Sequence, residues 1–426
     1  MTRRRWLLIC HAFNMDGVAS SLTVTDKIPH LVAAGIDPIV ISAPTGRKDT
    51  QVEHRQVFSP LPSGLRYEMR HYFKYHGGRA TLRAVLSALL LPFYLVEKLL
   101  LPFGSWWSWF ATAYREGRKA IRERKPELIY SSGGANSAHF AAYLLARRTG
   151  LPWLAEVHDP MIHADWKKGP FQYRWAAYVE KLICRHASVA IWFTPTALAR
   201  AKLRHLELGD RGHVMYPGAN PPDPPKLPYR KGERFALAHF GSLAPNRNLA
   251  ATLAAIDLVI ERDPQWRDLL RLHTYGGGWD EVSKAARATM HNPQVIEDFG
   301  RLEYDTATGL SGRQRVRQRM DAADALLLLH NTDAFSDEYF PSKVYEYLWA
   351  RRPILGLVAS PDLEQFLERL GYPVARGDDP RAIADQLEAL LQRWQRDDLA
   401  DAAGGSPYST QNAVTELIAW ADRCIR

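Results

Sequence analysis

The chain of 426 residues is 46% hydrophobic and 24% charged, so it is too long for one hydrophobic core and has the composition of a globular protein with two domains. Its three cysteines, Cys10, Cys184 and Cys424, are far apart, which excludes a cysteine-based metal site and fits a reducing compartment. The net charge of +9 is uneven, because residues 1–220 hold 30 Lys and Arg against 16 Asp and Glu, and the remainder holds 25 against 30.

The basic start of the chain is followed by an apolar run, Trp6–Cys10. This pattern imitates a secretory signal, but the run is too short and the polar residues Asn14 and Asp16 follow at once, so a first buried strand is expected. Asp16 and Gly17 then predict a tight turn that opens the first helix, where Gly17 allows a close approach to the backbone.

Further apolar runs alternate with helical stretches in both halves of the chain, such as 137–149, 249–262 and 342–350. Because strands that are apolar throughout are buried on both faces, this alternation predicts an α/β protein with two doubly wound (Rossmann-like) domains. Ligands of such sheets bind at the carboxyl ends of the strands, so the loops there are the candidate sites. The predicted strands are 6–10, 38–42, 128–131, 153–157, 189–193, 235–240, 270–275, 295–299, 325–329 and 353–358.

Residues 82–110 interrupt this alternation. Ala84–Val96 contains no charged residue, and tryptophans follow at positions 106, 107 and 109. The segment is too short to cross a bilayer, which needs about 20 apolar residues. With basic residues on both sides, residues 82–119 fit a segment lying in the headgroup layer of an anionic membrane, so a cytoplasmic protein, peripheral on the inner membrane face, is expected. The alternative is an ordinary pair of core helices with surface arginines.

Six prolines between Pro217 and Pro228 cannot continue a helix or a central strand, so they predict a linker between the domains. The expected division is 1–216 for an N-terminal domain with an apolar insertion at 66–118, 217–232 for the linker, 233–407 for a C-terminal domain, and 408–426 for a helix that returns to the first domain.

The most informative stretch runs from Glu338 to Glu346. Pro341 lacks an N–H group and suits the first turn of a helix, which places Glu338 on the preceding loop and Glu346 within the helix. The N–H groups of Ser342 and Lys343 then offer a site for phosphate, and the two carboxylates can accept hydrogen bonds from sugar hydroxyls. A sugar nucleotide needs both features. The alternative is a capped helix with two solvated acids.

Three features of the C-terminal half resemble the donor-binding domain of the GT-B glycosyltransferases, family 4 in particular. They are the strand and loop 240–247, the turn at 296–302, and the stretch from Glu338 to Glu346. In the N-terminal half, residues 126–160 resemble the acceptor domain of the same enzymes. The resemblance implies two Rossmann-like domains of the GT-B type that face each other across a cleft.

In that family the first glutamate contacts the hydroxyls of the donor sugar and the second holds the ribose hydroxyls, so the resemblance assigns these roles to Glu338 and Glu346. An ionised carboxylate suits both roles, because hydrogen bonds to a charged acceptor are strong. The backbone at Ser342 would hold the diphosphate.

The family also carries an arginine and, five positions later, a lysine that bind the diphosphate. Here Ser242 stands at the arginine position and Arg247 at the lysine position. Lys343 is the candidate for the missing cation and Arg301 the second choice, since cations stabilise a negative leaving group. Arg247 could instead be an ordinary solvated residue.

His158 ends a predicted strand at the position where many family members carry a histidine that faces and orients the donor sugar. The alternative is a buried histidine bonded to a backbone carbonyl. Gly277 lies in a glycine run that resembles the family's turn near the nucleotide, and Gly17 lies in the loop that touches the donor phosphate.

The chain contains no Asp-x-Asp pair, no Walker loop and no Gly-x-Ser-x-Gly elbow. These absences argue for a metal-independent enzyme without a cofactor, and against a kinase or a hydrolase of the elbow type.

The resemblance implies a hexosyltransferase that moves a sugar from a UDP- or GDP-sugar, with retention, to a hydroxyl of a lipid-linked or polysaccharide acceptor in cell-envelope or exopolysaccharide biosynthesis. A nucleotide-sugar epimerase on the same fold is the second candidate, although it needs no acceptor groove and no membrane segment. A nucleic-acid-binding protein is disfavoured, because the aromatic residues of the basic half cluster with apolar residues and do not interleave with basic ones.

Overall fold

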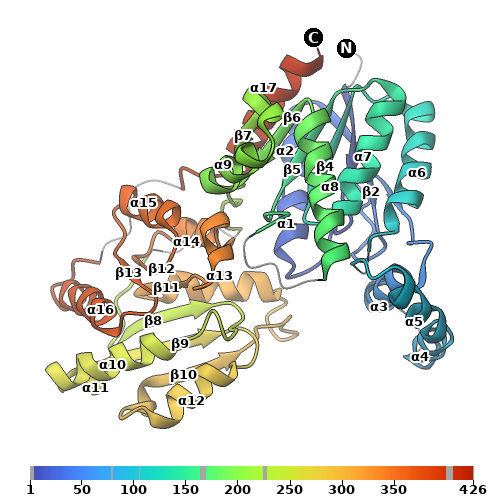
Figure 1. The fold of residues 1–426 in the computed structure, drawn as a ribbon. Coiled ribbons are helices and arrows are strands. Elements are labelled where there is room, and N and C mark those ends of the chain that lie inside the picture. Colours follow the sequence, from blue (N-terminus) through green and yellow to red (C-terminus); the bar gives the residue numbers. More distant parts are fainter. Residues whose placement is uncertain are drawn as a thin grey trace. The chain divides into compact units, whose positions relative to one another are not determined.

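The computed structural model of the protein describes residues 4–77, 80–104, 106–163, 169–223, 228–399 and 406–425. Two compact units make up the chain (Figure 1). Unit 1 comprises residues 1–217 and 410–426, and unit 2 comprises residues 218–409. From Gly218 onward the proline-rich segment therefore belongs to unit 2, while the last helix belongs to unit 1.

Unit 1 contains a parallel sheet of seven strands. The strands are β1 (Arg4–Ile9), β2 (Ile36–Ser42), β3 (Glu53–Gln56), β4 (Leu128–Gly133), β5 (Trp153–Val157), β6 (Val189–Trp192) and β7 (Gly212–Val214). Their order in the sheet is β3-β2-β1-β4-β5-β6-β7, so the direction in which the chain adds strands reverses between β1 and β4. Ligands of open parallel sheets bind at such a switch point.

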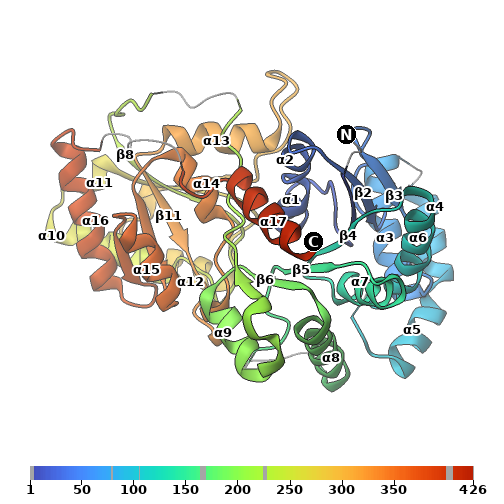
Figure 2. The same ribbon diagram turned by 90° about the horizontal axis from the view of Figure 1, so that it is seen from above.

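Unit 1 also contains helices, some of which cover the two faces of this sheet. They are α1 (Ala19–Thr25), α2 (Ile28–Ala33), α3 (Pro62–His76), α4 (Ala80–Leu89), α5 (Leu91–Leu100), α6 (Trp109–Arg124), α7 (Asn136–Thr149), α8 (Pro170–His186), α9 (Pro195–Arg204), the 3₁₀ helix η1 (Leu206–Arg211) and α17 (Thr410–Ile425). One face packs against α6, α7 and α8. The other packs against α1, α2 and α17, and Figure 2 shows α17 in red beside this sheet.

Helices α4 and α5 stand away from the sheet of unit 1 (Figure 1). Nine of their large apolar side chains are exposed, from 41% for Leu91 to 82% for Leu99. Within the described residues no single helix is long and apolar enough to span a bilayer, and α4 and α5 reach that length and hydropathy only together, across a 44° bend.

The tryptophans that follow α5 do not share this exposure. Trp109 begins α6, is fully buried, and donates from Nε1 to the carbonyl oxygen of Val57 at 2.9 Å. Ala113 and Ala120 of the same helix also lie in the core. The prediction that Trp109 and α6 belong to an interfacial apolar segment is therefore wrong, because one face of α6 packs on the sheet, and the apolar excursion ends before residue 109 and not at 118.

Unit 2 contains a parallel sheet of six strands. The strands are β8 (Phe235–Phe240), β9 (Leu270–Tyr275), β10 (Ile296–Gly300), β11 (Ala325–Leu329), β12 (Ile354–Val358) and β13 (Val374–Arg376). Their order is β10-β9-β8-β11-β12-β13, so the switch point of this unit lies between β8 and β11. The loops that follow β8 and β11 are the candidate site of unit 2.

The helices of unit 2 also lie on both faces of its sheet. They are α10 (Ala250–Arg262), α11 (Trp266–Leu269), α12 (Glu281–Thr289), η2 (Pro293–Val295), α13 (Gly312–Ala322), η3 (Ala334–Glu338), α14 (Lys343–Ala350), α15 (Pro361–Arg369) and α16 (Pro380–Gln395). Leu253 of α10 and Leu387 of α16 pack on one face. On the other face, Tyr347 of α14 accepts a hydrogen bond at Oη from the backbone N–H of Phe240, which fixes α14 against β8.

All ten strands predicted from the sequence are present, with ends within two residues of those expected. The expectation of an α/β protein with two Rossmann-like domains is therefore confirmed. Three strands, β3, β7 and β13, were not predicted, because they are edge strands of three or four residues with too few apolar side chains to form a run.

Close backbone contact between the loops after β8 and β9 makes Gly276 sensitive to substitution. A Cβ atom at Gly276 would lie 2.0 Å from the carbonyl oxygen of Gly241. We expect Gly276→Ala to lower the free energy of unfolding by about 1–3 kcal/mol, because the backbone must move. Urea denaturation measures this, with Gly277→Ala as the control, since a Cβ there meets nothing within 4 Å. Equal midpoints for the two variants would contradict the expectation.

Candidate active site

The loops at the switch point of unit 2 are joined by hydrogen bonds. The backbone N–H of Thr332, after β11, donates to the carbonyl oxygen of Asn246, after β8, at 3.0 Å. His330, at the end of β11, donates from Nε2 to the carbonyl oxygen of Tyr339 at 3.1 Å, which fixes the segment next to Glu338. Residues that lie far apart in the sequence are thus held at one place.

Glu338 is the last residue of η3 and is only 2% exposed. The alternative of a solvated acid therefore does not apply to Glu338. Its side chain is enclosed by the surrounding protein.

Helix α14 begins at Lys343, directly after Pro341 and Ser342, as the sequence predicts. Ser342 is the N-cap residue and is exposed, and its side chain makes no capping hydrogen bond. The Lys343 ammonium donates to Glu346 Oε2 at 2.6 Å, and these two side chains are 35% and 22% exposed. The cation expected to bind diphosphate is thus paired with the acid expected to bind ribose.

This ion pair keeps Glu346 ionised. Burial raises the pKa of its carboxyl group, but the nearby positive charges, Lys343 first and then Arg313 and Arg317, outweigh burial and lower the pKa. An ionised carboxylate can accept two hydrogen bonds from neighbouring hydroxyls, as the ribose role requires.

Arg247 and Ser242, the two positions at which the family carries cations, contact each other directly. Arg247 donates from Nε to the carbonyl oxygen of Ser242 at 3.1 Å and stays partly exposed. Burial, together with the charges of Arg247 and Lys343, lowers the pKa of His239 to about 4. Arg247, after β8, and Lys343, at the start of α14, therefore both contribute positive charge near His239 of β8.

Gly277 and Arg301 are exposed and follow β9 and β10. These strands lie one and two places beyond β8 in the sheet. Arg301 is thus two strands from the switch point, which makes it a poorer substitute for the missing diphosphate cation than Lys343.

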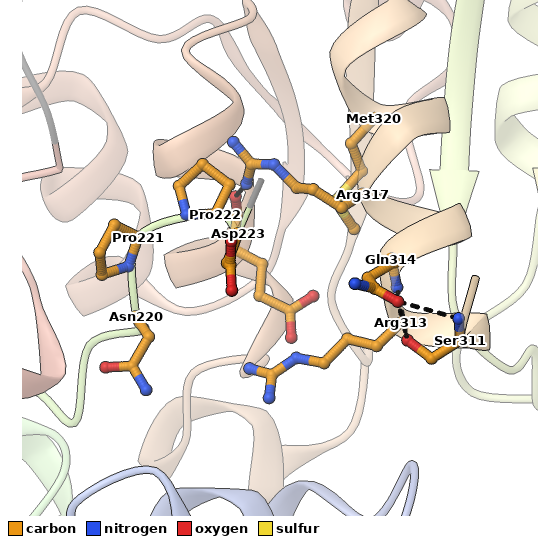
Figure 3. Close-up of a pocket in the computed structure, with 10 residues that line it drawn as sticks. Asn220, Pro221, Pro222, Asp223, Ser311, Arg313, Gln314, Arg317 and Met320 are labelled. Atoms are coloured by element: carbon orange, nitrogen blue, oxygen red, sulfur yellow. Dashed lines mark hydrogen bonds between the residues drawn. The ribbon is translucent and has the colours of Figure 1, made fainter. Parts of the chain in front are cut away.

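A cavity of about 240 Å³ opens beside Glu346 (Figure 3). The Arg313 side chain extends into it from α13, and Arg317 donates to the carbonyl oxygen of Glu346 at 2.9 Å. The wall contains carboxylate, guanidinium and amide groups, so it can bind a ligand with hydroxyl and N–H groups. The lining residues are Asn220, Pro221, Pro222, Asp223, Ser311, Arg313, Gln314, Arg317, Met320 and Glu346.

In unit 1, His158 follows β5 two positions after Glu156, so the two side chains point to the same side of the sheet. His158 Nε2 lies 2.9 Å from Glu156 Oε1 and 2.9 Å from Ser132 Oγ. The ring stacks on Phe193 with centroids 4.9 Å apart. The alternative of a histidine bonded to a backbone carbonyl is thus not what the structure shows.

Glu156 is the centre of a buried polar cluster. Lys27, between α1 and α2, donates from Nζ to both carboxylate oxygens at 2.8 and 2.7 Å. Tyr130 Oη and Ser132 Oγ donate at 2.5 and 2.7 Å. Lys27 is 1% and Glu156 0% exposed. Burial alone would raise the pKa of Glu156. The charge of Lys27 and the hydrogen bond from His158 outweigh burial and lower the pKa, so the carboxyl group is ionised.

Gly17 has a φ angle of 71° in the turn before α1, and it is exposed. A positive φ favours glycine, so this residue is required by the turn itself. The loop after β1 therefore has the tight geometry that the sequence predicts.

Four parts of the two sites were not predicted from the sequence: Lys27, Glu156, His239 and the α13 side chains of the cavity. The two-residue spacing of Glu156 and His158 within a predicted strand was an available signal. Lys27 and Arg313 carry no such signal, because their partners are distant in the chain. Among the described residues, no three His, Cys, Asp or Glu side chains form a group that could hold a metal ion.

The Lys27–Glu156 pair generates a prediction about stability. We expect Lys27→Met to lower the free energy of unfolding by about 3–5 kcal/mol, because it leaves a buried carboxylate without its cation. The double variant with Glu156→Gln removes both charges and should recover most of that loss. Urea denaturation of the wild type and the variants at neutral pH checks this.

The same pair predicts a pH dependence. The folded-state pKa of Glu156 is depressed, so its contribution is present above the unfolded pKa of about 4.3 and is lost as the pH falls further. The stability difference between the wild type and the double variant should therefore narrow below about pH 4. A difference that is constant with pH would contradict an ionised Glu156.

Part of unit 1 matches a known protein family. Residues 21–218 match the family described as Glycosyl transferase 4-like domain. Comparison with curated proteins gives no match.

Solved structures resemble the whole chain. Sucrose-phosphate synthase from Thermosynechococcus elongatus has a TM-score of 0.59 at 12% identity, over 99% of this chain and 97% of its own. α,α-Trehalose 6-phosphate synthase from Burkholderia multivorans has a TM-score of 0.59 at 13% identity, over 99% of both chains. HepE from Anabaena, in complex with UDP-glucose, has a TM-score of 0.54 at 12% identity, over 99% of this chain and 95% of its own.

At these identities the structural similarities establish the fold, while the family match covers most of unit 1. Residues 21–218 are therefore similar to a glycosyl transferase 4-like domain, and the chain has the two Rossmann-like domains of its GT-B structural neighbours.

Proposed function

We propose that the protein transfers a sugar from a nucleotide-diphosphate-sugar donor to a hydroxyl group of a lipid-linked or polysaccharide acceptor, with retention of the anomeric configuration and without a metal ion. The observation that carries this proposal is the hydrogen-bonded assembly of the loops after β8 and β11, which holds Arg247 and leads from Glu338 to Lys343 at the start of α14. A fold neighbour, HepE, is solved in complex with UDP-glucose, which supports a UDP-sugar donor.

In the proposed mechanism the cations stabilise the leaving group. As the bond to the sugar breaks, negative charge grows on the nucleoside diphosphate, and fixed positive charges at that place lower the barrier. Arg247 supplies one charge directly. Lys343 supplies the second when its ammonium turns from Glu346 toward the phosphate, while Glu346 accepts hydrogen bonds from the ribose.

Glu338 acts on the sugar. A buried carboxylate that accepts hydrogen bonds from the sugar hydroxyls holds the anomeric carbon in place for attack. For retention, the acceptor hydroxyl approaches the face that the diphosphate leaves, and a phosphate oxygen takes its proton.

We expect Glu338→Gln and Glu346→Ala each to lower kcat/KM for sugar transfer by about tenfold or more, since each removes charge-assisted hydrogen bonds to the donor. Release of nucleoside diphosphate, measured with a panel of UDP- and GDP-sugars, checks this. Glu364→Gln is the control, because Glu364 is an exposed acid in the first turn of another helix of unit 2. Turnover near that of the wild type in both site variants would refute the assignment, and isomerisation of the donor alone would favour an epimerase.

The acceptor proposal rests on α4 and α5, which we propose lie in the headgroup layer on the cytoplasmic face of a membrane. Their exposed apolar side chains are accompanied by exposed Arg70, Lys74 and Arg83, whose charges suit anionic headgroups. An acceptor carried by a lipid would then be held where the enzyme binds.

Buried carboxylates hold this helix pair in place. Glu97 of α5 accepts from the backbone N–H of Ser63 at 2.8 Å and from Trp107 Nε1 at 2.9 Å. Glu68 of α3 accepts from the backbone N–H of Ser59 at 2.6 Å. The exposed apolar surface of α4 and α5 therefore belongs to an anchored element, because hydrogen bonds to the buried carboxylates of Glu68, before α4, and Glu97, in α5, fix it at both ends.

Exposed apolar residues of the pair provide the test. We expect the triple variant Leu89→Glu, Phe93→Glu and Leu99→Glu to reduce binding to anionic phospholipid vesicles by about a hundredfold or more, because three apolar side chains no longer enter the bilayer. The control is Leu203→Glu with Leu206→Glu, which changes two leucines of unit 1 that are 79% and 84% exposed. Vesicle sedimentation measures both, and unchanged binding of the triple variant would contradict the membrane role.

A further inference from the structure

We propose that Glu156 is a positioning residue that fixes the tautomer of His158, so that His158 Nδ1 offers a lone pair to a hydroxyl or N–H group of the bound substrate. The inference rests on the proposed function, with His158 in the role of facing the donor sugar that the family resemblance assigns to it. It adds that His158 accepts and the substrate donates in that contact, and it names the residues that determine these roles.

The hydrogen bonds around Nε2 determine where the ring proton lies. A carboxylate can only accept, so Glu156 Oε1, at 2.9 Å, requires a hydrogen on Nε2. Ser132 donates its own hydrogen to Glu156 at 2.7 Å and therefore also offers only a lone pair to His158. Both neighbours thus require the Nε2–H form.

The other ring nitrogen is left as an acceptor. Nδ1 of His158 is buried and has no hydrogen-bond partner in the part of the chain that the structure describes, and the residue is 8% exposed. In the neutral ring with hydrogen on Nε2, Nδ1 carries a lone pair. Leaving a buried acceptor without a donor costs free energy, so the site favours a ligand that supplies an O–H or N–H group.

The surrounding groups keep this arrangement. Lys27, from the α1–α2 junction, balances the charge of Glu156, and Tyr130 and Ser132, from β4, complete the carboxylate's hydrogen bonds. Phe193, after β6, stacks on the imidazole and holds its plane. Lys27 and Glu156 thus balance each other's charge.

His139 shows how a structural histidine differs. It also lies in unit 1 and is buried, but both of its nitrogens have partners, since Nε2 bonds to the carbonyl oxygen of Gly133 at 3.0 Å and Nδ1 to Ser131 Oγ at 2.8 Å. Of these two histidines, only His158 has a ring nitrogen that lacks a hydrogen-bond partner among the described residues and that a ligand can then use.

Glu156→Gln inverts the predicted tautomer. Lys27 and Tyr130 are donors, so they hold the amide oxygen, and the amide NH₂ group then faces His158 Nε2. Nε2 must now accept, which moves the ring hydrogen to Nδ1 and turns the acceptor into a donor. The double variant with Lys27→Met removes both buried charges and serves if the single variant does not fold.

The measurement is nitrogen NMR of the full-length protein with labelled histidine, together with transfer kinetics. We expect the Nε2–H form of His158 in the wild type, the Nδ1–H form in Glu156→Gln, a mixture in the double variant, and an unchanged His139 throughout. We expect kcat/KM for sugar transfer to fall about ten- to hundredfold in Glu156→Gln, while the rise in melting temperature caused by UDP is retained. Glu180→Gln is the control, because Glu180 is also buried and paired with a basic residue, Arg204, in unit 1, and it should change neither readout.

An Nδ1–H form of His158 in the wild type would overturn the proposal, as would a changed tautomer with normal transfer. A stability defect alone would lower transfer in Glu156→Gln and Glu180→Gln alike, which would also count against it. Absence of transfer by the wild type with every donor would overturn the proposed function and the substrate contact with it. The NMR result reports on the tautomer independently of that outcome.

Discussion

Parallel pairing of the strands is the constraint on which both units of this protein depend. In a parallel sheet all strands end at the same edge, so the loops that follow them gather there, and those at the switch point have no connecting helix between them. In unit 2 this edge collects the loops after β8 and β11, which contribute Arg247, Glu338 and the start of α14. In unit 1 it collects the turn at Gly17 and the segment that holds His158.

The pairing of a lysine with a glutamate in each unit is the second organising feature. Lys343 lies on Glu346 and Lys27 on Glu156, so neither cation is exposed to solvent as an isolated charge. The two pairs differ in burial, and this decides what they can do. The partly exposed pair can open for a phosphate, because surface ion pairs contribute little free energy. The buried pair cannot be separated cheaply, so it suits a role in holding another group in place.

The helix pair α4–α5 departs from the usual placement of apolar and charged side chains in a folded protein. Large apolar side chains are exposed on it, while Glu68 and Glu97, which anchor the surrounding helices, are buried. This inversion of apolar and charged groups is typical of an element whose apolar side is covered by something outside the chain. Trp109, which composition alone grouped with the exposed segment, is part of the ordinary core.

The sequence by itself determined the α/β class, the ten principal strands, the start of α14 at Lys343 and the positions of the acidic and basic candidates, because apolar runs, proline and helix-start signals act over a few neighbouring residues. Short edge strands such as β3 escaped it, since pairing and not composition defines them. Only the tertiary structure decided which candidates meet. Lys27 and Glu156 are 129 residues apart in the chain, and a backbone hydrogen bond joins Thr332, after β11, to Asn246, after β8. Contacts of this kind depend on the order of strands in the sheet, and no local pattern of residues encodes that order.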